Sequence, residues 1–140
     1  MFSHVTLGTD DIAVARRFYD AVLGALGAPP GQVDERGRLV YSHAGGRLLL
    51  VRPIDGAGAT AGNGSTLGFL ADSPEAVDAW HAAGLAHGGR AIEDPPGIRH
   101  ATGGRRMYLA YLRDPSGNKL CAAHRLAQAA VAAAGAPGHS

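Results

Sequence analysis

The chain begins with a short alternation of apolar and polar residues that changes into a helical pattern. Val5 and Leu7 alternate with polar or small residues, which predicts a strand with one buried face. From about residue 12 the apolar positions recur at helical spacing, with Asp10 or Asp11 as the expected N-cap. The predicted buried stripe consists of Ala15, Phe18, Tyr19, Val22 and Leu26. The first segment therefore predicts a strand followed by an amphipathic helix.

The same pattern returns in the second half of the chain at a constant offset of 62 residues. Phe18 falls on Trp80 at this offset, and Gly27, which should end the first helix, falls on Gly89. Ser73 is the expected N-cap of the second helix, with Pro74 at its first position. The chain is therefore interpreted as a duplicated strand–helix unit.

Shorter strands are expected after each helix, and they complete two modules of order β-α-β-β-β. The return hairpins align too, with Tyr41 falling on Tyr111 and Leu50 on Cys121. The expected strands cover residues 32–35, 39–43 and 47–53 in the first half and 90–93, 107–113 and 119–124 in the second. A unit of about 55 residues buries too little surface alone, so the modules should pair within the chain or across a dimer.

These elements predict an α+β fold whose parts follow one another along the chain. They comprise module one (residues 1–54), a Gly-rich linker (55–64), module two (65–125) and an Ala-rich C-terminal tail (126–140). The tail is expected to form a short helix up to about residue 134, as a terminal appendage. The segment from Pro95 to Arg106 is expected to be a loop that could fold over a pocket.

Composition narrows the classes of function. The formal net charge is +1, from 13 basic and 12 acidic residues, so nothing suggests a nucleic-acid or anionic-membrane surface. A single cysteine excludes an internal disulfide framework. The N-terminus lacks the pattern of a secretory signal, and no apolar run approaches the ~20 residues of a membrane span. A soluble, cytoplasmic protein is expected.

Three segments together resemble one protein superfamily. The opening HVTLGTDDIAVARRFYDAVLGALG, the linker ending in GNG and the closing YLRDPSGNKL resemble the vicinal oxygen chelate superfamily. This superfamily includes glyoxalase I, extradiol dioxygenases and bleomycin-resistance proteins. The resemblance implies paired βαβββ modules whose curled mixed sheets form a concave pocket, and it implies a homodimer. In the enzymes of the superfamily, that pocket holds a divalent metal that acts as a Lewis acid.

The resemblance places the metal ligands of those enzymes on four positions of this chain. His4 matches the first ligand, but Thr66 stands where a second histidine is expected. Cys121 stands in place of a glutamate, and Leu50 in place of a further carboxylate. One histidine and one thiol make a poor cage, since catalytic zinc normally has three protein ligands. We therefore expect no metal cofactor, with a divalent Zn, Ni, Mn or Fe ion on His4 and non-standard ligands as the alternative.

Strand alternation extends the predicted pocket beyond these four positions. Thr6 should join His4 on its face, Arg52 should follow Leu50, and either Tyr108 or Tyr111 should point inward. Cys121 has two interpretations, a small buried apolar residue or a nucleophile activated by His4 across the pocket.

Three functions are compatible with this pattern. The first is a metal-independent protein that binds a small molecule, similar to the bleomycin-resistance branch, with no catalytic residue assigned. The second is a metal-dependent lyase or isomerase of the glyoxalase I type. The third is a dimeric domain with a vestigial pocket.

Overall fold

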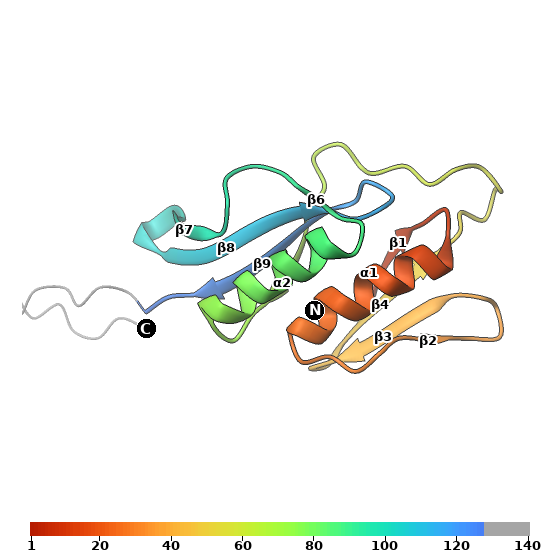
Figure 1. Cartoon of the computed structure of the whole chain (residues 1–140), viewed down its shortest axis with the longest axis horizontal. Coiled ribbons are helices and arrows are strands. Elements are labelled where there is room, and N and C mark those ends of the chain that lie inside the picture. Colours follow the sequence, from red (N-terminus) through yellow and green to blue (C-terminus); the bar gives the residue numbers. More distant parts are fainter. Residues whose placement is uncertain (128–140) are drawn as a thin grey trace, which may run out of the picture.

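The computed structural model describes residues 1–127, and these form two βαβββ modules that lie side by side (Figure 1). The α+β fold class and its paired modules are confirmed, with curled sheets that do not close into a barrel. The tail helix expected near residue 134 lies outside the described residues. No helix within residues 1–127 is both long enough and apolar enough to cross a membrane.

Module one contains a four-stranded mixed sheet of order β1-β4-β3-β2, in which β1 runs parallel to β4 and the other pairs are antiparallel. Its elements are β1 (Val5–Gly8), α1 (Ile12–Ala25), β2 (Gln32–Val33), β3 (Leu39–His43) and β4 (Gly46–Val51). Asp11 is the N-cap of α1, because its carboxylate accepts from the amide of Val14 at 3.1 Å. Asp10 instead accepts from the amide of Ala59 at 2.7 Å and so fastens the linker.

Module two repeats this order with one additional strand. Its elements are β5 (Leu67–Leu70), α2 (Pro74–Ala86), β6 (Arg90–Ala91), β7 (Gly97–His100), a short 3-10 helix (Thr102–Gly104), β8 (Arg106–Arg113) and β9 (Lys119–Arg125). The sheet order is β5-β9-β8-β6, and β7 also pairs with β8. Ser73 caps α2 as predicted, with Pro74 in its first turn. The prediction of a loop over residues 95–106 was wrong, because part of this segment forms β7.

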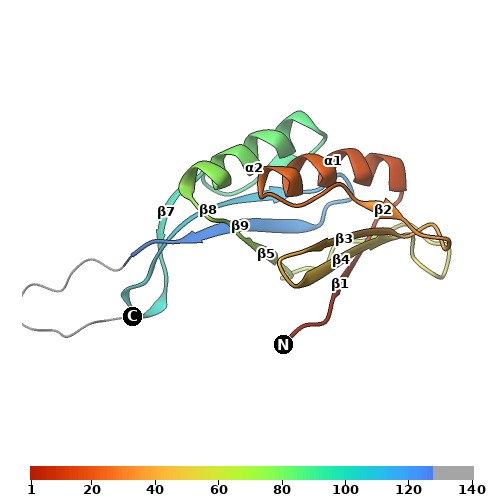
Figure 2. The ribbon, with the colours of Figure 1, turned by 90° about the horizontal axis from the view of Figure 1, so that it is seen from below.

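Both helices cover the same side of the two sheets (Figure 2), and the core lies between these layers. The largest fully buried side chains belong to the predicted helical stripes and to the strands beneath them. They are Phe18, Tyr19, Val22, Leu39, Leu50, Val77, Trp80, Leu112 and Leu120. Within residues 1–127, no α-helix covers the other side of the sheets, and we call this side the open face.

Candidate functional site

The open face is defined by strand alternation. Val5 pairs with Leu48 and packs into the core beneath the helices, so the next pair, Thr6 and Leu49, faces away from them. Module two repeats this arrangement, because Leu67 and Leu120 face the core and Gly68 and Cys121 form the next pair. The open face thus includes Thr6, Leu49, Gly68, Cys121 and Tyr111, which pairs with Cys121 in β8.

The prediction for Leu50 is wrong by one residue. Leu50 is fully buried in the core opposite Leu7, and Leu49 occupies the open face instead. A shift of one residue moves a strand side chain to the other face. The β3–β4 turn has two residues and the β8–β9 turn has five, and the offsets of 70 and 71 residues used for the two arms do not match the registers. The pairing of Tyr41 with Tyr111 is wrong as well, because Tyr41 lies in the core and Tyr111 on the open face. Leu49, not Leu50, is therefore the counterpart of Cys121.

Three other predicted residues lie just outside the strands. His4 precedes β1, is exposed, and lies 2.8 Å from the hydroxyl of Ser3 through its Nδ1. Thr66 precedes β5, and Arg52 follows β4; both are exposed. Within residues 1–127, no three His, Cys, Asp or Glu side chains lie close enough together to hold a metal ion. Within residues 1–127 of a single chain, these side chains thus do not supply the three ligands that a catalytic zinc normally has.

The two candidate tyrosines of β8 face opposite sides of the sheet. The hydroxyl of Tyr108 donates to Asp78 Oδ1 on α2 at 2.7 Å, which places this side chain on the helix side. Tyr111 pairs with Cys121 in the β8–β9 ladder and lies on the open face. The sequence left this choice open, and the structure assigns the open face to Tyr111 alone.

Charged side chains surround the thiol of Cys121, and sequence reasoning missed them. The ammonium group of Lys119 lies 4.8 Å from the centre of the Tyr111 ring and forms an ion pair with Glu93. Arg99, on β7, donates to the carbonyl of Pro95 at 2.9 Å. Lys119 could have been found from its spacing of two residues from Cys121. Glu93 and Arg99 had no comparable signal, since they come from separate elements.

The thiol is protonated at neutral pH. Burial, followed by the charge of Glu93, raises the pKa of Cys121 to about 11 against the opposing charges of Lys119 and Arg99. Burial also raises the pKa of Tyr111 above its usual range. A group that stays protonated is a weak nucleophile. The arrangement favours a role in binding over covalent chemistry for Cys121.

Two βαβββ modules with helices on one side and an open sheet face on the other define a class of small paired-module proteins. The model of the Glyoxalase/Bleomycin resistance protein/Dioxygenase superfamily matches residues 1–122. The chain therefore belongs to this superfamily, as the sequence resemblance predicted.

Solved structures agree with this assignment. The chain is 54% identical to a glyoxalase/bleomycin resistance protein from Albidiferax ferrireducens T118, with a TM-score of 0.85, covering 89% of this chain and 99% of the other. A family enzyme from Burkholderia phytofirmans PsJN is 24% identical, with a TM-score of 0.65 and coverage of 89% and 98%.

Lactoylglutathione lyase from Agrobacterium tumefaciens is 22% identical, with a TM-score of 0.60 and coverage of 89% and 92%. At this level of identity, the Burkholderia and Agrobacterium structures support the fold alone. A comparison with curated proteins found no match.

Proposed function

We propose that this superfamily member binds a small molecule on its open face without the metal site of the superfamily enzymes. The observation that carries the proposal is the residue set of that face. A protonated thiol, Cys121, and an apolar side chain, Leu49, stand at the last-strand positions. Neither a protonated thiol nor a leucine side chain is a ligand for a hard or borderline divalent ion.

The same face offers contacts that suit an organic ligand. Leu49 in module one and Cys121 in module two are buried apolar side chains of this face, and Tyr111 pairs with Cys121 in the β8–β9 ladder. Lys119 and Arg99 add positive charge at the rim, partly balanced by Glu93. Ligand sites usually combine apolar walls with a few polar groups in this way. We therefore expect a ligand with an aromatic or aliphatic body and at least one polar or anionic group.

Metal content tests the proposal against its alternative. The full chain would be purified without chelators, beside a His4→Ala variant, and both would be analysed for Ni, Zn, Mn and Fe. We expect far less than one equivalent of any metal in either protein. A stoichiometric metal that disappears in the variant would contradict the proposal and support a lyase or isomerase of the glyoxalase type.

A thermal-shift screen tests ligand binding itself. Small aromatic and thiol-conjugated compounds would be screened, because a ligand that binds only the native state raises stability by about 2.7 kcal/mol at 100 times its Kd. Tyr111→Leu should abolish the shift, whereas the matched Tyr108→Leu change on the helix side should not. Equal loss in both variants would indicate damage to the fold rather than to a site on the open face.

The proposal includes a homodimer and a cytoplasmic location. Large apolar side chains stay exposed in the single chain, with Phe2 at 75% and Ile98 at 51%, and a second copy would cover such surface. Sedimentation at several concentrations tests this, and a monomer at all of them would contradict it. Cytoplasmic location accords with one unpaired cysteine, and fractionation of cells tests it.

A further inference from the structure

A cavity lies at the junction between the two modules, beside the edge strand β5. Its volume is about 250 Å³, and its walls are the C-terminal end of α1, the β3–β4 hairpin and β5. The apolar lining includes Leu23, Leu26, Tyr41, Leu48, Leu67 and Phe69. Tyr41 and Leu48 belong to the core cluster beneath the helices, whereas Gly68 and Leu70, which also line the cavity, alternate with the core-facing residues of β5. The cavity thus reaches both sides of the sheet at the edge of β5, although Cys121 is not among its lining residues.

The cavity remains because the β3–β4 hairpin does not close this junction. Its turn consists of two residues, Ala44 and Gly45, both with positive φ. Within residues 1–127, no side-chain hydrogen bond joins residues 43–46 to β5 or to the start of α2. The corresponding turn of module two is longer and does reach the neighbouring module through hydrogen bonds.

The only charged or chargeable nitrogen groups that line the cavity belong to His43 and Arg47. Neither side chain forms a hydrogen bond or an ion pair with any of residues 1–127. No acidic side chain lines the cavity. Its one other polar side chain, Tyr41, already donates to Asp20 at 2.7 Å. The charge pattern is complementary to an anion whose apolar part enters the cavity.

The volume limits the size of that apolar part. A cavity of ~150 Å³ is enough for benzene, and pockets for drug-sized ligands begin at about 300 Å³. At about 250 Å³, this cavity fits a single ring or a branched chain with a short acidic arm. We propose that it binds a small monocarboxylate with one aromatic ring or a branched aliphatic body, whose carboxylate pairs with Arg47 and His43.

Two probes separate the anionic group from the apolar body. The full chain would be titrated with phenylacetate and with the uncharged phenylacetamide, and backbone amide shifts would be followed by NMR. Both probes should shift residues of the β3–β4 hairpin, β5 and the end of α1. Phenylacetate should bind more tightly, because only its carboxylate pairs with the cations at the mouth.

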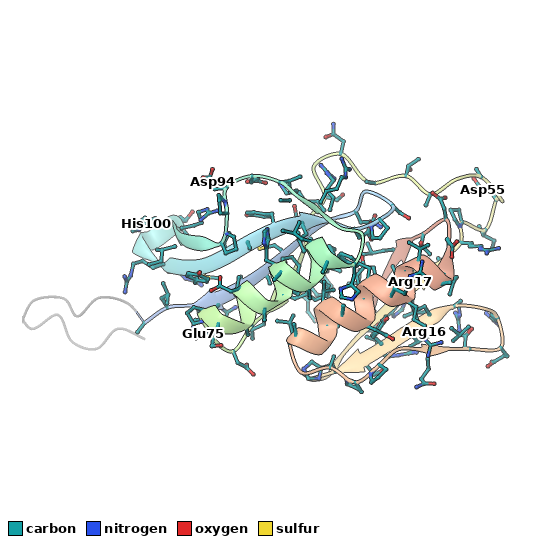
Figure 3. The ribbon with its side chains drawn as sticks, viewed as in Figure 1. Arg16, Arg17, Asp55, Glu75, Asp94 and His100 are labelled. Carbon is teal, nitrogen blue, oxygen red and sulfur yellow. The ribbon has the colours of Figure 1, made fainter. Side chains whose placement is uncertain are left out.

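Charge variants give the decisive comparison. Arg47→Gln should weaken phenylacetate about fivefold, the scale of one exposed ion pair, and leave phenylacetamide unchanged. Arg17→Gln removes an equally exposed arginine from the outer side of α1 (Figure 3) and should change neither affinity. Equal effects of the two variants, or equal affinity for the two probes in the wild-type chain, would overturn the proposal.

A variant that fills the cavity tests its location. Ala28→Phe adds a ring to the lining, and it should abolish binding of both probes while circular dichroism still reports the native fold. Should this variant not fold, the Arg47→Gln comparison still decides the matter. Three results contradict the proposal: shifts confined to the residues around Cys121 and Tyr111, no saturable shift at about 10 mM probe, or hairpin shifts that depend on protein concentration alone. The last would assign the cavity to a second copy.

Discussion

The two junctions between the modules differ although the modules repeat each other. At one junction, the β8–β9 turn packs against the start of α1 and is fastened there by hydrogen bonds. Asn118 Nδ2 donates to the carbonyl of Gly8 at 3.0 Å, and the amide of Asp10 donates to Ser116 at 3.3 Å. At the other junction, the β3–β4 turn leaves a cavity. One hairpin has become a structural clamp, and its counterpart has left room for a ligand.

The clamp is organised around one buried carboxylate. Asp114 is 3% exposed and accepts from the amides of Ser116 and Asn118, each at 2.9 Å. It also accepts the hydroxyl of Tyr19 at 2.5 Å, and this contact crosses from module two to α1. Burial, followed by the charge of Asp114, raises the pKa of Tyr19 well above its usual range. His81 occupies the Tyr19 position in module two, and burial lowers its pKa.

Removal of the Asp114 carboxylate should lower the stability of the protein more than any other change at the two junctions. Asp114→Ala leaves the Tyr19 hydroxyl and the Asn118 side chain without their buried acceptor, and we expect a loss of about 3–5 kcal/mol in the free energy of unfolding. Urea denaturation measures it. The control is Asp55→Ala in the linker, where an exposed carboxylate accepts, among residues 1–127, only from the amide of Ala57, at 3.0 Å. If Asp114→Ala lowered the free energy of unfolding as little as Asp55→Ala, the Asp114 carboxylate would not be the group that stabilises this turn.

Leu49 in module one and Cys121 in module two occupy equivalent positions of the open face, and the thiol of Cys121 provides a chemical probe of that face. A pKa of about 11 instead of 9.0 leaves about 100 times less thiolate at neutral pH, so iodoacetamide should alkylate Cys121 about 100-fold more slowly than an unfolded-chain thiol. Below pH 11, the rate should rise about tenfold per pH unit. Mass spectrometry follows the modification.

Variants of the charged residues near Cys121 show which charges set the pKa of its thiol. Glu93→Gln removes a negative charge that disfavours the thiolate, so alkylation should become faster. Lys119→Gln removes a positive charge, and alkylation should become slower. Rapid alkylation of the wild-type chain at neutral pH would instead reveal a low pKa and reopen a nucleophilic role for Cys121.

Helix packing provides a third comparison, because Val22 of α1 corresponds to Gly84 of α2. A Cβ at Gly84 would overlap Leu112 Cδ1 and lie 3.3 Å from Val22 Cγ1. Gly84→Ala should therefore cost about 1–2 kcal/mol despite the better helix propensity of alanine. The same change at Gly24 of α1, where a Cβ meets nothing within 4 Å, should stabilise by about 0.5 kcal/mol. Thermal unfolding should show opposite signs, and equal signs would contradict close helix packing at Gly84.

The sequence alone was sufficient to predict both helices and the superfamily. Both helices have strong periodicity and local capping signals, and Ser73 and the glycines that follow each helix are where the pattern predicts them. The DPSGN turn marks the closing hairpin, and the superfamily match extends over residues 1–122. These features depend on residues close together in the chain, so a single sequence carries the information.

The site was less predictable because it depends on register and on distant contacts. Residues 48–51 are all apolar, so alternation cannot show which of them faces the core, and Leu50 was assigned to the wrong face. Strand β7 was missed because the glycine and prolines around it indicate a loop. Glu93 reaches Lys119 across 26 positions of the chain, and no local pattern indicates such a pair.

The smallest expected effect compares two tyrosines of the core, whose ring centres lie 6.2 Å apart. Tyr41 donates to Asp20 Oδ1 at 2.7 Å on the side of the cavity, whereas Tyr19 donates to Asp114 in the clamp. Asp20 keeps the amide of Gly31 as a donor when the Tyr41 hydroxyl is lost. Tyr41→Phe should therefore cost only about 1 kcal/mol.

Tyr19→Phe should cost about 2 kcal/mol, since it removes a hydrogen bond to a buried carboxylate. Urea denaturation of both variants and of the double variant measures the difference and any coupling between the two hydroxyls. A Tyr41→Phe loss equal to or larger than that of Tyr19→Phe would show that the cavity side is held as firmly as the clamp. The two junctions would then differ in shape but not in their contribution to the free energy of unfolding. The hydroxyl of Tyr41 would stabilise the cavity side as much as the hydroxyl of Tyr19 stabilises the clamp.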